Sequence, residues 1–396
     1  MARVLCAWEF GGDLGHVRRL MPIARELRTM GHSTVFAFRD SAYLDGALAE
    51  GFEAFVAPLL RVPAAMAVSP LNFSDILLNL GFDDRFGLQG ALRAWRSMYS
   101  LIAPDVVVTD YAPTALIAAA TLEIPRVTIG TGFSQPRLAE PLPALRPWAR
   151  SDPNVLRAID DRVLNSVRAA LAGVSERVPR SAAGLFDANA HLLCTFAEID
   201  PFGTRADVEY MGPQGDAASG AAVDWPTRPG ARVLAYLKPG DARFAAVMDA
   251  LARLDASVIV AAPGLPPEAA ISASRGAMRV VPGPVNLERV IGQASLCICH
   301  AGPGLVARGL AAGVPFALLP MHLEQYLVAM RVREGASAEM ISPDEPAPDF
   351  HAWFAGLLAN EDLKRAAEAR AASLRDHSFD AATRRAAARI AAVASA

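Results

Sequence analysis

The sequence predicts an α/β protein made of doubly wound parallel sheets in two domains. Short apolar runs that suit buried strands alternate with helical patterns along most of the 396 residues, which is typical of such sheets. A glycine-rich turn follows a strand in each half, and a segment rich in Gly, Pro and Ser separates the halves. We therefore expect domains at residues 1–212 and 231–375, a linker at 213–230, and a C-terminal helical segment at 376–396.

The first half repeats a unit of strand, loop and helix. An apolar run at 4–8 leads into a glycine turn that ends at His16, then into a pattern with apolar residues on one helical face, and then into a strand at 34–38. Two further strands are expected at 105–110 and 126–129, separated by a short helix. Ligands of doubly wound sheets bind beyond the carboxyl ends of the strands, so the glycine turn lies where a site is expected.

The second half contains a stretch with the form of a phosphate-binding loop. A buried strand ends just before His300, glycines follow at Gly302 and Gly304, and a helix is expected from 305 to 312. The N–H groups and the partial positive charge of a helix start suit an anion such as a diphosphate. The strands expected in this half lie at 233–237, 258–260, 296–299 and 316–319.

Composition narrows the class of protein. The net charge of -3 gives no reason to expect nucleic-acid binding, which usually needs a basic face. No apolar run reaches the ~18 residues of a membrane span, and the N-terminal residues meet a charge too early for a signal peptide. The cysteines all lie in apolar runs without metal-ligand spacing, which predicts reduced, buried thiols and a cytoplasmic protein: Cys6, Cys194, Cys297 and Cys299.

Residues near both ends of the chain resemble the signatures of one known family. The N-terminal group is Gly12-Asp-Leu-Gly15-His16, with Pro22 and Gly31-His32 after it. The C-terminal group is His300-Ala-Gly302-Pro-Gly304, followed by Gly309, Gly313-Val-Pro315, Pro320 and Glu324-Gln325. Together they resemble the GT-B nucleotide-sugar glycosyltransferases, in the branch of the UDP-glycosyltransferases and the bacterial macrolide glycosyltransferases.

The resemblance implies a particular architecture. It implies the GT-B fold, with two Rossmann-like domains that face a central cleft, the acceptor held by the first and the nucleotide sugar by the second. It also implies that a C-terminal helix, here residues 380–394, packs back onto the first domain. No metal is required for the transfer that it implies, and the sequence has no Asp-x-Asp motif that would suggest one.

The resemblance assigns catalytic roles to a histidine and a carboxylate. His16 matches the family's general base, and an imidazole titrates near neutral pH, as that role needs. Asp110, at the carboxyl end of its strand, matches the partner that fixes the tautomer of the base and stabilises its charged form. Taken alone, His16 equally suits a helix start that bonds local backbone, and Asp110 suits a turn.

The resemblance also implies a donor site, with two departures from the family. Leu305 stands where a Thr or Ser hydroxyl is usual, and Arg308 stands where a ribose-binding glutamate is usual. We expect Lys238 to contact the diphosphate in place of the lost hydroxyl, with a solvated surface lysine as the alternative. The residues expected to bind the donor are Gly15, Lys238, His300, Gly302, Gly304, Arg308, Glu324 and Gln325.

Two stretches break the regular alternation, at 61–95 and 135–185. They are rich in Pro and large apolar residues without a clean period, which suits either loops and helices around a variable cavity or ordinary surface excursions. Their apolar character indicates a small, largely apolar acceptor, although such residues more often lie in a core. The residues expected to bind the acceptor are Phe73, Phe82, Trp95 and Phe133.

The sequence therefore predicts an inverting glycosyltransferase. It would transfer a sugar from a UDP- or dTDP-sugar to a hydroxyl of a natural-product, phenolic or lipid-like acceptor. The departures at Leu305 and Arg308 also fit a non-catalytic GT-B partner or activator protein that has lost donor chemistry. An epimerase on the same fold would need a carboxylate-rich cleft, for which only Glu324 is well placed. The sequence leaves the oligomeric state open, a homodimer included.

Overall fold

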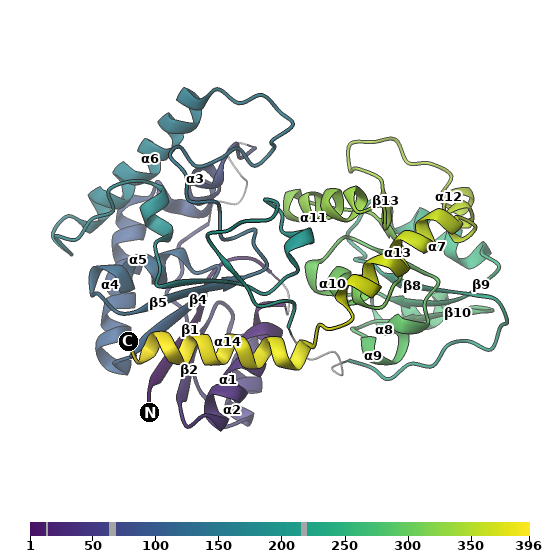
Figure 1. The fold of residues 1–396 in the computed structure, drawn as a ribbon, viewed down its shortest axis with the longest axis horizontal. Coiled ribbons are helices and arrows are strands. Elements are labelled where there is room, and N and C mark those ends of the chain that lie inside the picture. The colour runs from purple at the N-terminus through teal and green to yellow at the C-terminus, as the bar shows by residue number, and fades with distance from the viewer. Residues whose placement is uncertain (13–14, 63–68, 215–219) are drawn as a thin grey trace. The chain divides into compact units, whose positions relative to one another are not determined.

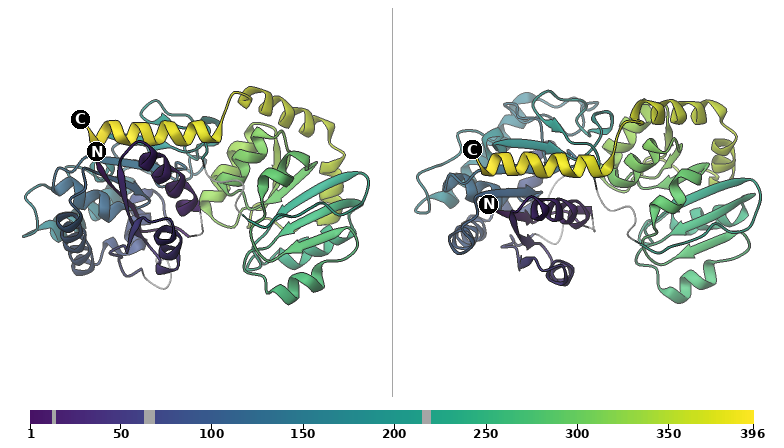
Figure 2. Two further views of the ribbon diagram at one scale, coloured as in Figure 1. Left: turned by 90° about the horizontal axis from the view of Figure 1, so that it is seen from below. Right: turned by 60° about the horizontal axis from the view of Figure 1, so that its bottom comes forward.

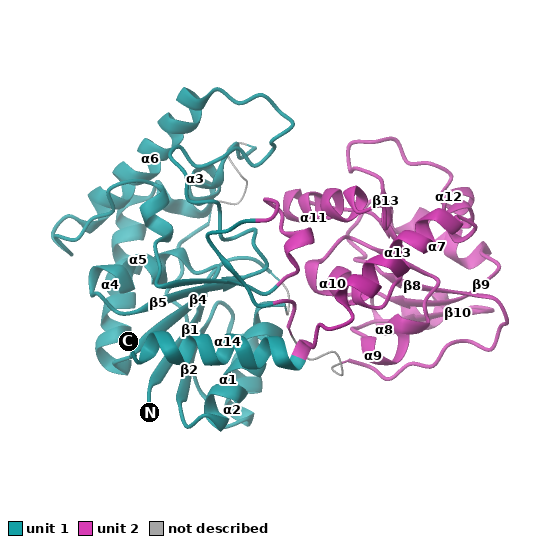
Figure 3. Ribbon diagram, in the orientation of Figure 1, with its two compact units in different colours: residues 1–194, 205–211, 380–396 teal, residues 195–204, 212–379 magenta. Residues whose placement is uncertain are grey.

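The computed structural model describes residues 1–12, 15–62, 69–214 and 220–396 and divides into two compact units (Figure 3). Unit 1 comprises Met1–Cys194, Arg205–Met211 and Asp380–Ala396, and unit 2 comprises Thr195–Thr204 and Gly212–Phe379. Parts of three sequence predictions fall outside the described residues: positions 13–14 of the glycine turn, 63–68 of the first irregular stretch and 215–219 of the linker.

Unit 1 is built on a seven-stranded sheet whose neighbouring strands are all parallel (Figure 1). The strand order is β3-β2-β1-β4-β5-β6-β7, so the direction of winding reverses between β1 and β4. Ligands of such sheets bind beside the reversal point. The strands are β1 (Arg3–Trp8), β2 (Ser33–Phe38), β3 (Glu53–Val56), β4 (Val106–Asp110), β5 (Arg126–Gly130), β6 (Ala190–Leu193) and β7 (Glu209–Tyr210).

Helices connect and cover these strands. Among these helices, α4 packs extensively against both α5 and α6. The α-helices of this unit are α1 (Gly15–Thr29), α2 (Leu44–Ala49), α3 (Phe73–Leu77), α4 (Arg85–Ile102), α5 (Pro113–Thr121), α6 (Pro153–Leu171) and α14 (Phe379–Ala394). Short turns of other helix types occur at Ser41–Tyr43, Leu78–Phe82 and Ala183–Phe186.

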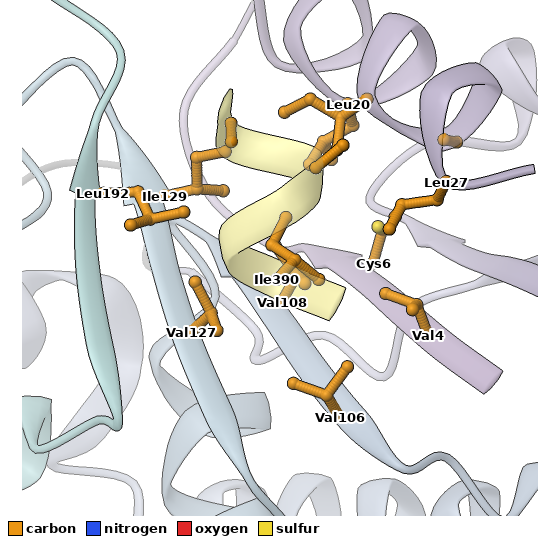
Figure 4. Close-up of a cluster of buried hydrophobic side chains, with 14 of the residues drawn as sticks. Val4, Cys6, Leu20, Leu27, Val106, Val108, Val127, Ile129, Leu192 and Ile390 are labelled. Atoms are coloured by element: carbon orange, nitrogen blue, oxygen red, sulfur yellow. The ribbon is translucent and has the colours of Figure 1, made fainter. Parts of the chain in front are cut away.

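The C-terminal helix α14 is part of the core of unit 1. Ile390 is fully buried and gathers with Leu20 of α1 and Val108 of β4 (Figure 4). Ala386 and Ala387 are also fully buried, and their short side chains let the helix lie close to its neighbours. At the edge of the sheet, Arg389 pairs with Glu209 of β7 at 2.8 Å. Both termini therefore belong to unit 1 (Figure 2).

Unit 2 is built on a six-stranded parallel sheet in the order β10-β9-β8-β11-β12-β13. Successive residues of β8 enter different apolar clusters, Val233 on one face and Leu234 on the other. Both faces are thus buried, as parallel sheets require. The strands are β8 (Ala231–Tyr236), β9 (Ala256–Ala261), β10 (Met278–Val281), β11 (Leu296–Cys299), β12 (Phe316–Leu318) and β13 (Ala338–Met340).

The winding of the unit 2 sheet reverses between β8 and β11. The helix that follows β11 is α10, so its N-terminus lies at the position where doubly wound sheets bind ligands. The α-helices of unit 2 are α7 (Phe244–Arg253), α8 (Pro267–Ala273), α9 (Leu287–Val290), α10 (Pro303–Ala311), α11 (Leu323–Glu334), α12 (Phe350–Leu358) and α13 (Glu361–Leu374).

The two parallel sheets confirm the predicted fold class. The strands that sequence patterns did not indicate are β3, β7, β10 and β13, whereas the apolar run ending at Cys194 indicated β6. Each strand that was not indicated has four residues or fewer, and several lie at the edges of the sheets. Polar or charged residues interrupt these short runs, whereas the equally short β11 and β12 are wholly apolar and were predicted.

Candidate active site

The reversal point of the unit 1 sheet brings three polar side chains together. Trp8 at the end of β1 pairs in register with Asp110 at the end of β4, and α1 begins close by at Gly15. His16 Nδ1 lies 2.9 Å from Asp110 Oδ1. Arg19, one turn further along α1, donates a hydrogen bond from Nη1 to the other carboxylate oxygen, Oδ2. Histidine, carboxylate and guanidinium thus form one continuous cluster.

The carboxylate of this cluster is fully buried and ionised. Burial opposes the charge on Asp110, but Arg19 and His16 outweigh it and hold the pKa of Asp110 below its ordinary value. An ionised carboxylate beside Nδ1 of His16 favours the tautomer with its proton on that nitrogen. The basic nitrogen of the ring is then Nε2, which faces away from Asp110.

Packing holds the His16 ring in place. It stacks on the Trp8 ring with the centroids 4.9 Å apart and the planes 18° apart. A Cβ on Gly11 would stand 2.7 Å from His16 Nε2, and Gly11 has a φ of +82°, so only glycine fits there. The Tyr111 ring also lies against Gly11, 3.2 Å from the same Cβ position. Gly11 therefore lies between the imidazole of His16 and the ring of Tyr111 and is close to both.

The N-terminus of α10 in unit 2 is open to a ligand. Its N-cap is Gly302, which has no side chain to accept a hydrogen bond from the first helical N–H groups. Apart from their own helix and chain neighbours, no described atom lies within 4 Å of the Cβ position of Gly302 or Gly304. In the turn between β11 and α10, the residue with a left-handed backbone is Ala301, at a φ of +59°. The glycines thus leave space for a ligand, whereas the turn itself is made by alanine.

His300 is engaged within the protein through both ring nitrogens. Nδ1 donates to the carbonyl oxygen of Leu319 at 2.8 Å, and Nε2 accepts from the N–H of Lys238 at 2.9 Å. Burial lowers the pKa of His300 against the opposing effects of the Leu319 carbonyl and of Asp241 nearby. A neutral His300 therefore connects the loops that follow β8, β11 and β12.

A half-buried ion pair reinforces the same connection. Arg243 binds Asp241, with Nη2 and Oδ2 2.7 Å apart, and donates to the carbonyl oxygens of Leu319 and Pro320. Burial raises the pKa of Asp241, but the bonds and charge of Arg243 outweigh it and lower the pKa overall. No sequence pattern indicated the role of Arg243, because the carbonyl oxygens that it binds lie 76 and 77 residues further along the chain.

The other residues predicted to bind the donor occupy varied positions. Lys238 is half-buried after β8, beside His300. Gln325 is buried and accepts from the Met321 N–H through Oε1 at 2.8 Å, and Glu324 lies in the first turn of α11. The Arg308 guanidinium lies 4.2 Å above the ring of Phe379. Gly15 opens α1 and therefore belongs to unit 1.

A pocket in unit 1 accounts for some of the predicted acceptor residues. It has about 510 Å³ of empty volume, solvent at its mouth included, and lies beyond the ends of β4 and β5. Phe73 lines it although it is only 1% exposed, and the ring of Phe133 lies 6.0 Å from that of Phe73. Phe82 and Trp95 instead lie in the core, fully buried, so they offer no surface to a ligand. Trp95 is held there by a hydrogen bond from its Nε1 to Thr114.

Sequence reasoning missed Arg19 and the polar side of this pocket. Arg19 follows His16 by three residues on one helix, a spacing that places two side chains on the same face, so that signal was present. Thr109, Thr128 and His191 line the pocket from three different strands. The register that aligns them joins distant segments and leaves no local pattern in the sequence.

The described residues contain neither a cluster of metal-ligating side chains nor a membrane-spanning helix. No group of three or more His, Cys, Asp or Glu side chains in the described ranges is placed to hold a metal ion. No helix within the described residues is both long enough and apolar enough to cross a membrane.

Comparison with solved structures identifies the fold. The kitacinnamycin glycosyltransferase superposes with a TM-score of 0.75 at 20% identity, over 99% of each chain. A calicheamicin glycosyltransferase gives a TM-score of 0.73 at 21% identity, over 99% of this chain and 98% of that one. The glycosyltransferase VinC, solved in complex with dTDP, gives 0.72 at 18% identity, over 99% of each chain. The chain has the GT-B fold.

Sequence comparison agrees with this GT-B assignment. A PGL/p-HBAD biosynthesis glycosyltransferase of Mycobacterium tuberculosis is 26% identical over 309 residues, which cover 71% of this chain and 70% of that protein. No family model matches the chain. The GT-B chain is therefore similar to glycosyltransferases both in structure and, more distantly, in sequence.

Proposed function

We propose that this GT-B protein is an inverting glycosyltransferase that moves a sugar from a UDP- or dTDP-sugar to a hydroxyl of a small, largely apolar acceptor. The observation that carries the proposal is the cluster of His16, Asp110 and Arg19. It presents a basic Nε2 atom one residue away from Tyr111, which lines the apolar pocket of unit 1. The glycosyltransferases that resemble the chain support the same reaction class.

In the proposed reaction His16 is the general base. Its Nε2 takes the proton of the acceptor hydroxyl as the oxygen attacks the anomeric carbon, and the bond from that carbon to the diphosphate breaks with both electrons going to the leaving group. A single displacement inverts the anomeric centre. Asp110 keeps the proton on Nδ1 and stabilises the imidazolium that forms. Arg19 keeps the Asp110 carboxylate ionised and oriented.

Unit 2 is proposed to bind the donor at the N-terminus of α10. The uncapped N–H groups and the positive end of the helix stabilise the charge that grows on the diphosphate. Lys238 adds a point charge at the carboxyl end of β8, which would replace the hydrogen bond that the side chain of Leu305 cannot donate. His300 positions this loop through its two internal bonds, so its contribution to donor binding is indirect.

Nucleotides bound by similar proteins support the choice of donor. VinC was solved with dTDP, and the spinosyn rhamnosyltransferase SpnG was solved with thymidine diphosphate and separately with the spinosyn aglycone. We extend the same ligand classes to this chain, with transfer independent of metal. Activity that survives a chelator would support the last point, and activity that needs an added divalent cation would contradict it.

A non-catalytic partner protein is the alternative function. It is favoured by Arg308, which stacks on Phe379 in place of a ribose-binding glutamate. Such a protein would bind no nucleotide and transfer no sugar. The intact cluster at His16 argues for the enzyme, since a partner protein has no need to keep a paired base.

The proposed function is tested by mass spectrometry of products. The purified chain is incubated with a panel of UDP- and dTDP-sugars and with phenolic and macrolide acceptors. We expect a glycosylated product from at least one pair, with the anomeric configuration opposite to that of the donor by NMR. Absence of both transfer and donor hydrolysis across the panel, together with no nucleotide binding, would favour the partner protein instead.

A further inference from the structure

One side of the unit 1 pocket carries a row of polar side chains. Thr109 of β4 pairs in register with Thr128 of β5, and Thr128 pairs in register with His191 of β6. All of them line the pocket. The residues that alternate with them, Val127 and Leu192, face the apolar core on the other side of the sheet. Central parallel strands are normally apolar on both faces, so a polar row beside a pocket calls for a ligand.

Hydrogen bonds along this row fix the proton of the histidine. Gln135 Nε2 donates to Thr128 Oγ1 at 2.8 Å and lies 3.4 Å from the Leu192 carbonyl oxygen, so two acceptors orient its amide. Thr128 Oγ1 accepts that hydrogen bond, so its hydroxyl donates its own hydrogen bond to His191 Nδ1, 2.8 Å away. Because Nδ1 accepts, the neutral His191 ring carries its proton on Nε2.

The Nε2–H of His191 has no acceptor among the described residues of the protein. Burial lowers the pKa of His191, against the opposing charges of Asp187 and Asp207 and with a lesser lowering effect of Arg205. The ring is therefore neutral at physiological pH. It offers the pocket one fixed hydrogen-bond donor.

The remaining lining is mixed: Ser134, Arg205 and Asp207 line the pocket together with apolar and aromatic side chains. Phe73 and Phe186 meet edge to face with centroids 5.3 Å apart, and Leu116 and Tyr111 complete the wall. Tyr111 also contacts Gly11, against which His16 Nε2 lies. Aromatic and aliphatic side chains thus form one part of the lining, with Tyr111 on the side toward His16 and His191 in the polar row.

We propose that this pocket binds an acceptor in which a ring-sized apolar body bears the reacting hydroxyl at one end and a carbonyl oxygen at the other, and that His191 Nε2–H donates to that oxygen. The inference rests on the proposed function, which places the reacting hydroxyl at His16. It names a substrate class, phenolic ketones and similar carbonyl compounds, and makes His191 a determinant of specificity.

The test compares the binding of two phenols of equal shape, 4-hydroxyacetophenone and 4-isopropylphenol. Only the first has the carbonyl oxygen. Affinity is measured by isothermal titration calorimetry on the full chain without a sugar donor. We expect the wild-type protein to bind the ketone several-fold to about tenfold more tightly than the alkyl analogue, as one neutral hydrogen bond allows.

Three variants connect this preference to the residue row. His191→Leu should bind the two phenols equally, whereas His191→Gln, which keeps an N–H donor, should retain part of the preference. Thr128→Val should weaken the preference, because Nδ1 then loses the group that fixes the tautomer. Melting temperatures of the variants confirm that each is folded, and if His191→Leu does not fold, the other two decide the result.

The outcomes separate this inference from the proposed function. Equal binding of both phenols by the wild-type protein, binding of neither, or an undiminished preference in a folded His191→Leu would overturn it. None of these measurements involves sugar transfer. A preserved ketone preference without transfer from any donor would contradict the proposed function alone.

Discussion

At the scale of single residues, the candidate base depends on charges that the protein arranges behind it. Asp110 is fully buried, and a lone buried carboxylate would take up a proton. Arg19 and His16 prevent this by holding its pKa below the ordinary value. The resemblance to a family drew attention to His16 and Asp110, but the guanidinium that keeps Asp110 ionised came to light only in the structure.

Replacement of Arg19 should destabilise the protein near neutral pH and make its stability less dependent on acid. In the wild type, Asp110 contributes stability that is present above its unfolded pKa and is lost as pH falls through its lowered folded pKa. In Arg19→Met, burial acts unopposed by the guanidinium, so the folded pKa of Asp110 rises toward or above its unfolded value. The variant should therefore be less stable than the wild type near pH 7, and its unfolding free energy should fall less between pH 7 and 4. Urea unfolding between pH 4 and 7 measures this. Arg18→Met, on the same helix, serves as control because Arg18 has no ion pair within the described residues.

Equal unfolding free energies at pH 7, and an equal decline from pH 7 to 4, in Arg19→Met and Arg18→Met would contradict this assignment. Such a result would mean that Asp110 does not depend on Arg19 for its charge. Activity near neutral pH should also fall in Arg19→Met, since the carboxylate loses the bond that orients its second oxygen.

A second buried carboxyl predicts a different pH dependence. Burial raises the pKa of Glu9 to about 8, although its oxygens accept from the N–H groups of Thr114 and Ala115 at the start of α5. Its contribution to stability is full below its unfolded pKa and is lost as pH rises through about 8. We expect the unfolding free energy to fall by roughly 5 kcal/mol at most across that range.

The variant Glu9→Gln should remove most of this decline, because glutamine has no proton to lose. Unfolding by urea at a series of pH values from 5 to 9 gives the measurement. Glu176→Gln, at an exposed position, is the matched control and should leave the curve of the wild type unchanged. A decline of the same size in Glu9→Gln would show that another group causes it.

At the scale of elements, α10 combines an open end with a tightly packed middle. Gly304 in its first turn has open space at its Cβ position, whereas a Cβ on Gly309 would overlap the ring of Phe316. The sequence predicted a helix after the glycines, and the structure has it. The different duties of the two glycines could not be predicted, since they depend on what β12 places beside the helix.

The two glycines of α10 should therefore respond differently to alanine. Gly304→Ala should keep the stability of the wild type and lower nucleotide affinity, because the new methyl group stands where a diphosphate approaches the helix. Gly309→Ala should lower the unfolding free energy by about 1–3 kcal/mol through overpacking. Urea unfolding and titration with dTDP measure the two effects. Undiminished dTDP affinity in Gly304→Ala would argue against a donor at this helix end.

The sequence did not indicate which aromatic side chains line the pocket and which lie in the core. Phe73, Phe82 and Trp95 share one irregular stretch, and composition treats them alike. In the structure all three are buried, but Phe73 lines the pocket, whereas Phe82 and Trp95 do not. Which side of a helix meets a core depends on packing against distant segments, and an aperiodic stretch does not encode it locally.

At the scale of the whole molecule, the sequence was sufficient for the fold class. Alternating strands and helices, with a glycine turn in each half, led to two doubly wound sheets, and structural similarity confirms the GT-B fold. The polar row of Thr109, Thr128 and His191 was beyond prediction, because it is created by the register of three strands. The fold thus follows from local patterns, whereas the pocket chemistry follows from their alignment.

Binding of a nucleotide should stabilise the whole molecule. A ligand present at 100 times its Kd adds about 2.7 kcal/mol to the unfolding free energy, which raises the melting temperature by several degrees. We expect this shift with UDP or dTDP, and a smaller one in Lys238→Ala if its ammonium group contacts the diphosphate. Identical shifts in the two proteins would exclude that contact, and no shift with either nucleotide would favour the non-catalytic partner.

The rate of sugar transfer by His16→Ala tests the central claim most directly. With a donor and acceptor that the wild-type protein couples, kcat/KM of the variant should fall by roughly 10²–10⁴-fold, as loss of a general base requires. Its affinity for dTDP should stay unchanged, because His16 belongs to unit 1 and the proposed donor site belongs to unit 2. Transfer by folded His16→Ala at the wild-type rate would show that His16 is not the base.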